Sequence, residues 1–203
     1  YAVTLTLFCC ELDKKYEKLF VFLQDDIAKK TLSVETAIHL WAEPRDRIST
    51  YYQSFSESSV LAKYICSCQD GTLSSRMLHL SKAVTNFFSG DRSEVGYEYF
   101  SGDSEPEPMV INRDIADCAI KTVELSQEGK VTLLHIVGKQ GSGRRFLVKH
   151  CAAAVYEGVI FVSASAIIKA DSVSSAFGQA VCTARLEGCS LCITDFELFL
   201  EDE

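Results

Sequence analysis

The chain has 203 residues, of which 47% are apolar and 24% charged, which is enough apolar material for a packed core. Its net charge of −8 and its scattered basic residues argue against nucleic acid as a partner, because phosphate backbones are bound by clustered Lys and Arg. We expect no membrane helix and no signal peptide, because no apolar run approaches about 20 residues and no leader pattern opens the sequence.

The ends and the cysteines indicate a piece of an intracellular protein. The chain begins at Tyr1 rather than Met and ends in the acidic "FLEDE", so we expect both ends to be cuts through something longer. The nine cysteines are odd in number, and four of them stand where apolar residues fit the pattern, which favours reduced thiols: Cys118, Cys151, Cys182 and Cys192. A zinc site built from the C-x-C at Cys66 and the C-x-x-C at Cys189 is disfavoured by its spacing.

Residues 1–86 have a helical pattern and are expected to form an all-α subdomain. In "SVETAIHLW", Ser33 is the expected N-cap, and Pro44 should end the helix near Glu43. This helix should present one apolar face made of Val34, Ala37, Ile38 and Trp41. The stretches "SSVLAKYICSC" and "SSRMLHLSKAVTNFF" have the pattern of further helices.

Residues 87–109, "FFSGDRSEVGYEYFSGDSEPEPM", differ from both neighbours in composition. They are rich in Ser, Gly, Asp, Glu and Pro and have no apolar period. We expect a linker or exposed loop, and the "EPEP" cluster within it is expected to be solvated rather than a ligand site.

Residues 110–203 alternate between helical and strand-like patterns and predict the start of an α/β subdomain. A helical stretch, "NRDIADCAIKTVELSQEG", precedes the apolar run "VTLLHIV" at 131–137, which has the length of a buried strand. A glycine loop and the helix "RRFLVKHCAAAVYEG" follow. The strand "VIFVSA", the helix "SVSSAFGQAVCTARLEG" and the strand "CSLCIT", which ends at Asp195, complete the pattern. Buried strands separated by helices predict a parallel sheet flanked by helices.

The glycine loop "VGKQGSGRRF", 137–146, has the spacing of a phosphate-binding loop with altered residues at its end. The ATP-binding form runs G-x-x-x-x-G-K-[ST], and here Arg144 replaces the lysine and Arg145 the hydroxyl residue. Glycines between a strand and a helix are common in any doubly wound fold, but the acid-ended strand at Asp195 favours an ancestral site for ATP or ADP, with Mg²⁺ as a candidate second ligand. The loop residues expected to hold the nucleotide are Gly138, Gln140, Gly141, Ser142 and Gly143.

The substitutions in the loop indicate that the chemistry has been lost. Arg144 can hold phosphate by a forked hydrogen bond but is bulkier than lysine, and Arg145 offers no hydroxyl to a metal. We therefore expect weak nucleotide binding, or none, very little hydrolysis, and no catalytic residue in this chain.

Several stretches resemble dynein heavy chains. "LLHIVGKQGSGRRFLVKHCAA" resembles the loop segment of their fourth AAA+ module, where G-S-G-[KR] is common, so Arg144 is a tolerated variant while Arg145 departs further. "LCITDFELFLED" resembles the module's next strand, with Phe196 where AAA+ ATPases usually place a glutamate. Upstream, "VINRDIADCAIKTVELSQEGKVTLLHI" is similar to the helix before the loop strand. "LSVETAIHLWAEPRDRI" resembles the lid of the third module through Leu40, Trp41 and Arg47.

The resemblance implies a segment of an AAA+ motor ring, from the lid of the third module through the Walker B strand of the fourth. It implies a structural or regulatory nucleotide site in a parent that hydrolyses ATP and moves on microtubules. Implied partners are neighbouring AAA+ modules of the same heavy chain, dynein light and intermediate chains, and microtubules through parts outside this segment. The implied setting is cytoplasm and cytoskeleton, with the axoneme of a cilium or flagellum preferred. Two alternatives stay open: a degenerate ring of another AAA-type ATPase or remodeller, and a non-motor, dynein-like scaffold.

Overall fold

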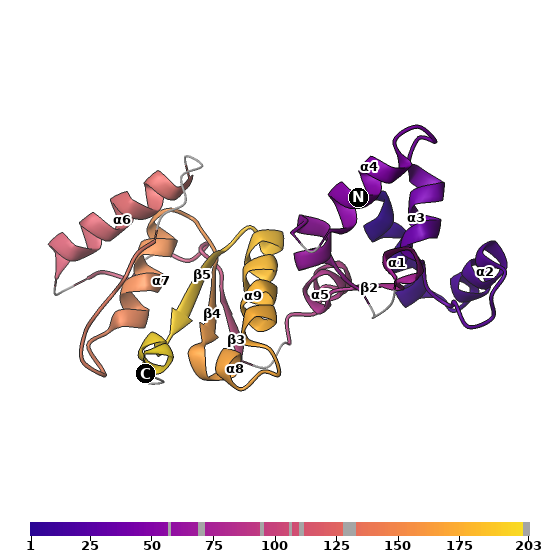
Figure 1. Ribbon diagram of the computed structural model, residues 1–203. Coiled ribbons are helices and arrows are strands. Elements are labelled where there is room, and N and C mark those ends of the chain that lie inside the picture. The colour runs from indigo at the N-terminus through magenta and orange to yellow at the C-terminus, as the bar shows by residue number, and fades with distance from the viewer. Residues whose placement is uncertain are drawn as a thin grey trace. The chain divides into compact units, whose positions relative to one another are not determined.

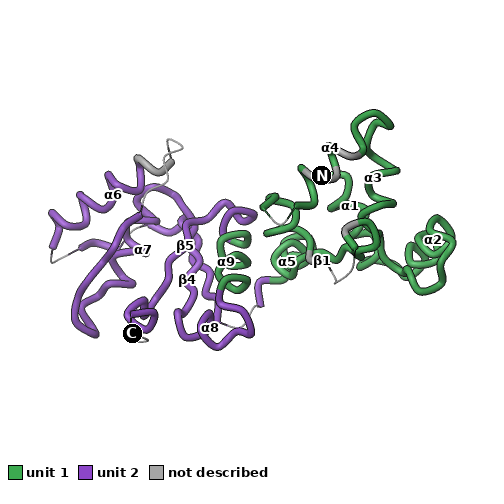
Figure 2. The backbone as a smooth tube through the Cα atoms, in the orientation of Figure 1, with its two compact units in different colours: residues 1–91, 174–183 green, residues 92–173, 184–203 purple. Residues whose placement is uncertain are grey.

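The computed structural model describes residues 1–56, 58–68, 72–93, 96–105, 107–109, 112–127 and 133–200. The chain divides into two compact units (Figures 1 and 2). The first unit contains residues 1–91 and 174–183, and the second contains residues 92–173 and 184–203.

The first unit combines helices with a short antiparallel hairpin. Its helices are α1 (Ala2–Leu12), α2 (Lys15–Gln24), α3 (Val34–Trp41), α4 (Arg47–Phe55) and α5 (Lys82–Ser89), with a π-helical turn at Leu61–Ile65 and a 3-10 turn at Leu73–Ser75. Strands β1 (Cys66–Cys68) and β2 (Leu78–Leu80) pair antiparallel, with Cys66 opposite Leu80. The core of the unit is formed by Leu7, Phe20, Leu32, Val34, Ala37, Ile38, Phe55, Cys66 and Leu78.

The hairpin shows that the all-α character expected for residues 1–86 is wrong. Strands of three residues are too short to show a period of two in the sequence. Their apolar residues therefore fit the helical patterns predicted for the neighbouring stretches. The first of the two expected helices shrinks to the turn at Leu61–Ile65. The second begins only at Lys82, after β2.

Helix α3 begins and ends where the sequence predicts. The Ser33 hydroxyl accepts a hydrogen bond from the Thr36 amide at 3.3 Å, as an N-cap should. The helix stops at Trp41, ahead of Pro44. Val34, Ala37 and Ile38 are buried as expected, whereas Trp41 remains 44% exposed, so the predicted apolar face is wrong at that residue.

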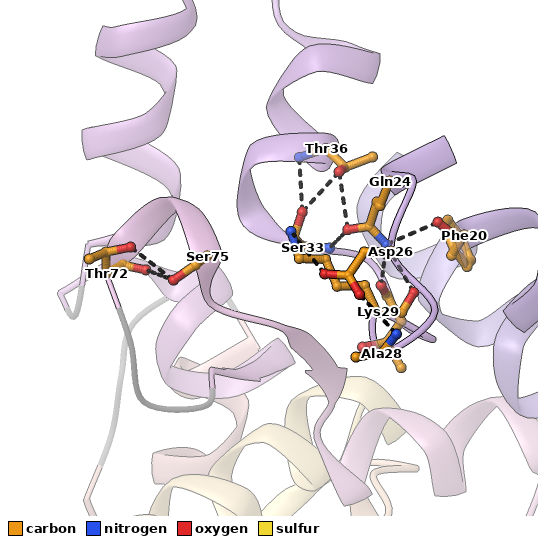
Figure 3. A network of polar contacts seen from close by, with 10 residues as sticks. Phe20, Gln24, Asp26, Ala28, Lys29, Ser33, Thr36, Thr72 and Ser75 are labelled. Carbon is orange, nitrogen blue, oxygen red and sulfur yellow. Dashed lines mark hydrogen bonds and ion pairs between the residues drawn. The ribbon is translucent and has the colours of Figure 1, made fainter. Parts of the chain in front are cut away.

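A single amide side chain ties the loop after α2 to the start of α3 (Figure 3). Gln24 lies in the last turn of α2, and its nitrogen and oxygen together make five hydrogen bonds. Nε2 donates to the carbonyls of Phe20, Lys29 and Thr31, while Oε1 accepts from the Ser33 amide and the Thr36 hydroxyl. The loop therefore has little freedom to move away from the cap of α3.

The second unit contains a mixed three-stranded sheet with helices before and between its strands. Strand β4 (Val159–Ser163) is central, paired antiparallel with β3 (Tyr97–Phe100) and parallel with β5 (Ser190–Thr194). The helices are α6 (Arg113–Gln127), α7 (Arg144–Ala154) and α8 (Ala164–Ile168), with a 3-10 turn at Phe196–Phe199, while residues 174–183 of α9 (Val173–Glu187) belong to the first unit. The predicted α/β class and the parallel β4–β5 pair are confirmed. The wholly parallel sheet is wrong, because β3, from the segment expected to be a linker, adds an antiparallel strand.

The strand expected at 131–137 is not observed in its described part. Residues 131 and 132 lie outside the described residues, and 133–137 are not part of a strand. Leu133 is 93% and Val137 79% exposed, whereas Ile136 packs against the α6–α7 cluster. A buried strand needs neighbours for its backbone hydrogen bonds, and among the described residues the sheet consists of β3, β4 and β5 without this segment.

Helix α7 lies between α6 and the sheet (Figure 1). Toward the sheet, Val148 and Ala152 pack against Phe161. Toward α6, Leu147 and Cys151 contact Ala116 and Ala119. In the sequence, the spacing of Ile111, Ile115, Cys118 and Ala119 predicts one apolar face for this helix, and that prediction is partly wrong. Ala119 is buried, but Ile115 and Cys118 are exposed, and Ile111 lies outside the described residues.

Candidate functional site

The glycine loop enters α7 as the sequence predicts. Gly141 and Gly143 have φ angles of +79° and +80°, a backbone conformation that costs other residues strain. The Ser142 amide donates to the Lys139 carbonyl at 3.0 Å, closing a turn that also holds Gln140. Gly143 is the N-cap of α7, so the loop stands at the positive end of an 11-residue helix.

Gly138 lies against the side chain of Ser142. A Cβ on Gly138 would lie 2.6 Å from the Ser142 hydroxyl oxygen and 3.7 Å from Cδ of Arg144. The half-buried Arg144 side chain therefore runs back along the loop. No ion pair to Arg144 is found among the described residues.

Arg145 turns toward the sheet and is held from two sides. Its Nη2 donates to Oε2 of Glu98 at 2.6 Å, and its Cζ lies 4.9 Å from the centre of the Phe161 ring. Lys149, one helical turn further on, donates to the other Glu98 oxygen at 2.9 Å. Arg145 and Lys149 thus converge on one carboxylate of β3 above one aromatic ring of β4.

The register of the sheet explains why these groups meet. Glu98 is directly opposite Phe161, and Phe161 is directly opposite Cys192, so the three side chains form a row on the sheet face covered by α7. The hydrogen bond from Lys149, together with the nearby Arg145 charge, lowers the pKa of Glu98. Burial raises the pKa of the Cys192 thiol, and Arg145 offsets part of that rise.

A cavity of about 360 Å³ opens at the carboxyl ends of β4 and β5. Asp195 directly follows β5, in a left-handed conformation (φ +54°) that Asp tolerates better than most residues. Arg145 and Asp195 both line this cavity. The remaining lining residues are Gly96, Tyr97, Glu98, Phe161, Ser163 and Thr194.

The structure therefore unites two of the expected site residues and places the others nearby in the chain. Arg145 and Asp195 share the cavity, whereas Gly138, Gln140, Gly141, Ser142, Gly143 and Arg144 form the loop outside its lining. Sequence reasoning missed Glu98, which lies in the segment expected to be a linker. The alternation in "YEYF", with aromatic residues on both sides of Glu98, is typical of a strand and could have revealed it.

Two histidines have partners near the site. The ring of His135 lies 6.5 Å from that of Phe196, which places the segment before the loop beside the residues after β5. His150, further along α7, bonds through Nδ1 to the Glu107 carbonyl at 2.8 Å and stacks on Phe146. Neither contact resembles a catalytic pairing.

The donor set at the cavity does not fit a magnesium ion held in the usual way. That arrangement needs a hydroxyl from the loop's last residue and a carboxylate from the strand end, and here the hydroxyl position carries the guanidinium of Arg145. Within the described part of the chain, no group of three or more His, Cys, Asp or Glu side chains could hold a metal ion. The described helices also include none with the length and apolar character needed to span a membrane.

Comparison with known proteins bears on the first half of the chain. Residues 2–96 match the family described as "Winged helix domain, variant". The described elements of this stretch, helices followed by the β1–β2 hairpin, agree with that description. No curated protein and no solved structure matches the chain.

Proposed function

We propose that the second unit is an AAA+-type P-loop unit whose nucleotide site binds ATP or ADP weakly and hydrolyses very little. The observation that carries the proposal is the cavity shared by Arg145, from the first turn after the glycine loop, and Asp195, from the end of β5. Ligands of α/β sheets bind outside the carboxyl ends of the strands, and the positive end of α7 suits phosphate.

Three features support weak binding without hydrolysis. Arg145 places a guanidinium, in contact with Glu98 and Phe161, at the position where a metal-binding hydroxyl is usual. Phe196 stands where a water-polarising carboxylate is needed, and its ring contacts His135 and Phe199. Arg144 remains as a forked phosphate donor beside the loop. Such a site holds a ligand for structural or regulatory purposes rather than turning it over.

The resemblance of the loop and of the β5 segment leads us to place this unit in a dynein heavy-chain ring. A nucleotide held there would influence the geometry of the ring, while force would come from other modules. Its partners would be neighbouring AAA+ modules of the same chain, dynein light and intermediate chains, and microtubules through other parts. The axoneme is the proposed setting.

A second candidate, a non-motor scaffold or remodeller, is favoured by the winged-helix match. That match covers the stretch in which Leu40, Trp41 and Arg47 carry the resemblance to a dynein lid. Residues 2–96 contain 11 basic and 12 acidic residues, which is a poor balance for binding a phosphate backbone. We propose that this segment contacts protein, and an anisotropy titration with duplex DNA at low salt should accordingly show no binding.

Purification of the protein from its native source under mild conditions separates the two candidates. The motor proposal predicts co-purifying dynein light and intermediate chains and microtubule co-sedimentation that ATP reverses. Tubulin binding without dynein subunits, or neither, would favour the scaffold. Hydrolysis is tested on the purified chain, where a turnover number typical of enzymes, about 1 s⁻¹ or more, would overturn the degenerate site.

A further inference from the structure

We propose that Arg145, held in place by Glu98, is a resident cation that excludes a divalent metal from the end of β5. This inference rests on the proposed nucleotide site and specifies its ligand as a metal-free polyphosphate. In other P-loop sites a magnesium ion supplies positive charge beside the phosphates. Here the guanidinium of Arg145 supplies that charge.

The Arg145 guanidinium lies at the end of β5. Arg145 lines the same cavity as Thr194 and Asp195, the residues at the end of β5. In P-loop sites the metal lies between the hydroxyl of the loop's last residue and the acid of a neighbouring strand end. Arg145 occupies the position of that hydroxyl, and its side chain lines the cavity together with Asp195. Its positive charge therefore lies where a metal would have to enter.

The guanidinium has two partners where it lies. Glu98 accepts its hydrogen bond at 2.6 Å, and the Phe161 ring lies beneath it at 4.9 Å. Phe161 is 1% exposed and fixed by the sheet. A divalent ion entering the cavity would have to displace this group or accept its repulsion.

A simpler explanation treats Arg145 as a tether that attaches α7 to β3. Lys149 makes the same kind of contact, to the same carboxylate, from the same helix, yet it does not line the cavity. A tether predicts that Arg145 and Lys149 are equivalent. A resident cation predicts that only Arg145 governs metal access, so Lys149→Ser is a matched control for Arg145→Ser.

The test measures ADP affinity by NMR titration for the wild-type protein, Arg145→Ser and Lys149→Ser, each with EDTA and with Mg²⁺. We expect the wild type and Lys149→Ser to give the same Kd in both conditions. Arg145→Ser should bind about tenfold more tightly with Mg²⁺ than with EDTA, and adding Asp195→Asn should remove that gain. Magnesium-dependent binding by the wild type, or an equal response from both single variants, would overturn the inference while leaving a nucleotide site in place.

Mn²⁺ binding followed by electron paramagnetic resonance decides the case in which no protein binds ADP. Uptake of Mn²⁺ by Arg145→Ser that depends on Asp195 would then support the resident cation, while the proposed nucleotide site would fall. Absence of uptake by Arg145→Ser would refute the resident cation as well. Folding of each variant is checked by the dispersion of its amide spectrum.

Discussion

Glu98→Gln is the substitution that most cleanly probes how α7 is attached to the sheet. It keeps the size of the side chain and removes the charge that both Arg145 and Lys149 contact, at 2.6 and 2.9 Å. The side chains of Glu98, Arg145 and Lys149 are 47%, 54% and 36% exposed, so solvent screens both pairs. Exposed pairs contribute about 0.2–1 kcal/mol each, so we expect the second unit to lose about 1 kcal/mol.

Urea unfolding at low and at high sodium chloride measures this loss. Urea is preferred over guanidinium because it adds no ions, and the loss should fall to less than half at about 1 M salt, where the Debye length is about 3 Å. Hydrogen exchange of the β4 amides reports the second unit. The fluorescence of Trp41, the single tryptophan, reports the first unit and should not change.

Glu124→Gln provides the matched control. Glu124 is exposed on α6 of the same unit, and no ion pair to it occurs among the described residues. It should cost nothing measurable. A loss in Glu98→Gln that equals that of the control, or that is unchanged by salt, would refute the account of the Glu98 contacts.

The pH dependence of the same contacts has a definite sign. Because the pKa of Glu98 is lowered in the folded state, its contribution is fully present above the unfolded value of about 4.3 and is lost as pH falls through the folded value. The difference between wild type and Glu98→Gln should therefore disappear in acid.

Three further predictions concern other parts of the chain. Gly138→Ala should destabilise the second unit by about 1 kcal/mol at most, because its Cβ would meet the exposed Ser142 hydroxyl at 2.6 Å and force it to turn, and Ser142→Gly should restore much of the loss in urea unfolding. Gln24→Glu should destabilise the first unit by about 2–3 kcal/mol, measured by Trp41 fluorescence, because a carboxylate cannot donate to the carbonyls of Phe20, Lys29 and Thr31. With Ellman's reagent at neutral pH, Cys118 should react well before Cys10, Cys151, Cys182 and Cys192, because Cys118 is exposed while burial raises the pKa of the others, that of Cys10 to about 11. Equal rates for these thiols would contradict the burial of the four slow ones. No rescue by Ser142→Gly would contradict the contact between positions 138 and 142, and an unchanged stability of Gln24→Glu would contradict the hydrogen bonds of Gln24.

The parts of the fold that sequence predicts well are those set by local chemistry. The cap at Ser33, the end of α3 before Pro44 and the glycine loop before α7 each depend on residues within a few positions. The β4–β5 pair follows from two apolar runs separated by helices. These features need no knowledge of distant partners.

The features that were missed depend on partners far away in the chain. Glu98 is part of the site because β3 pairs with β4, some sixty residues later, and nothing near Glu98 indicates that pairing. The run at 133–137 has the composition of a buried strand, yet it has no strand neighbour in the described structure. The orientation of the Arg145 side chain likewise depends on Glu98 and Phe161. Both residues lie outside the loop sequence.

The central claim is that residues 138–145 wrap a phosphate at the start of α7, with Asp195 across the cavity. Mapping amide chemical shifts while ADP is added to the isotope-labelled chain tests it most directly. The account predicts changes concentrated at Gly141, Ser142, Gly143 and Arg144, with a smaller change at Asp195 and a Kd on the order of 1 mM. An unchanged spectrum well above that concentration, or changes centred elsewhere in the chain, would contradict it.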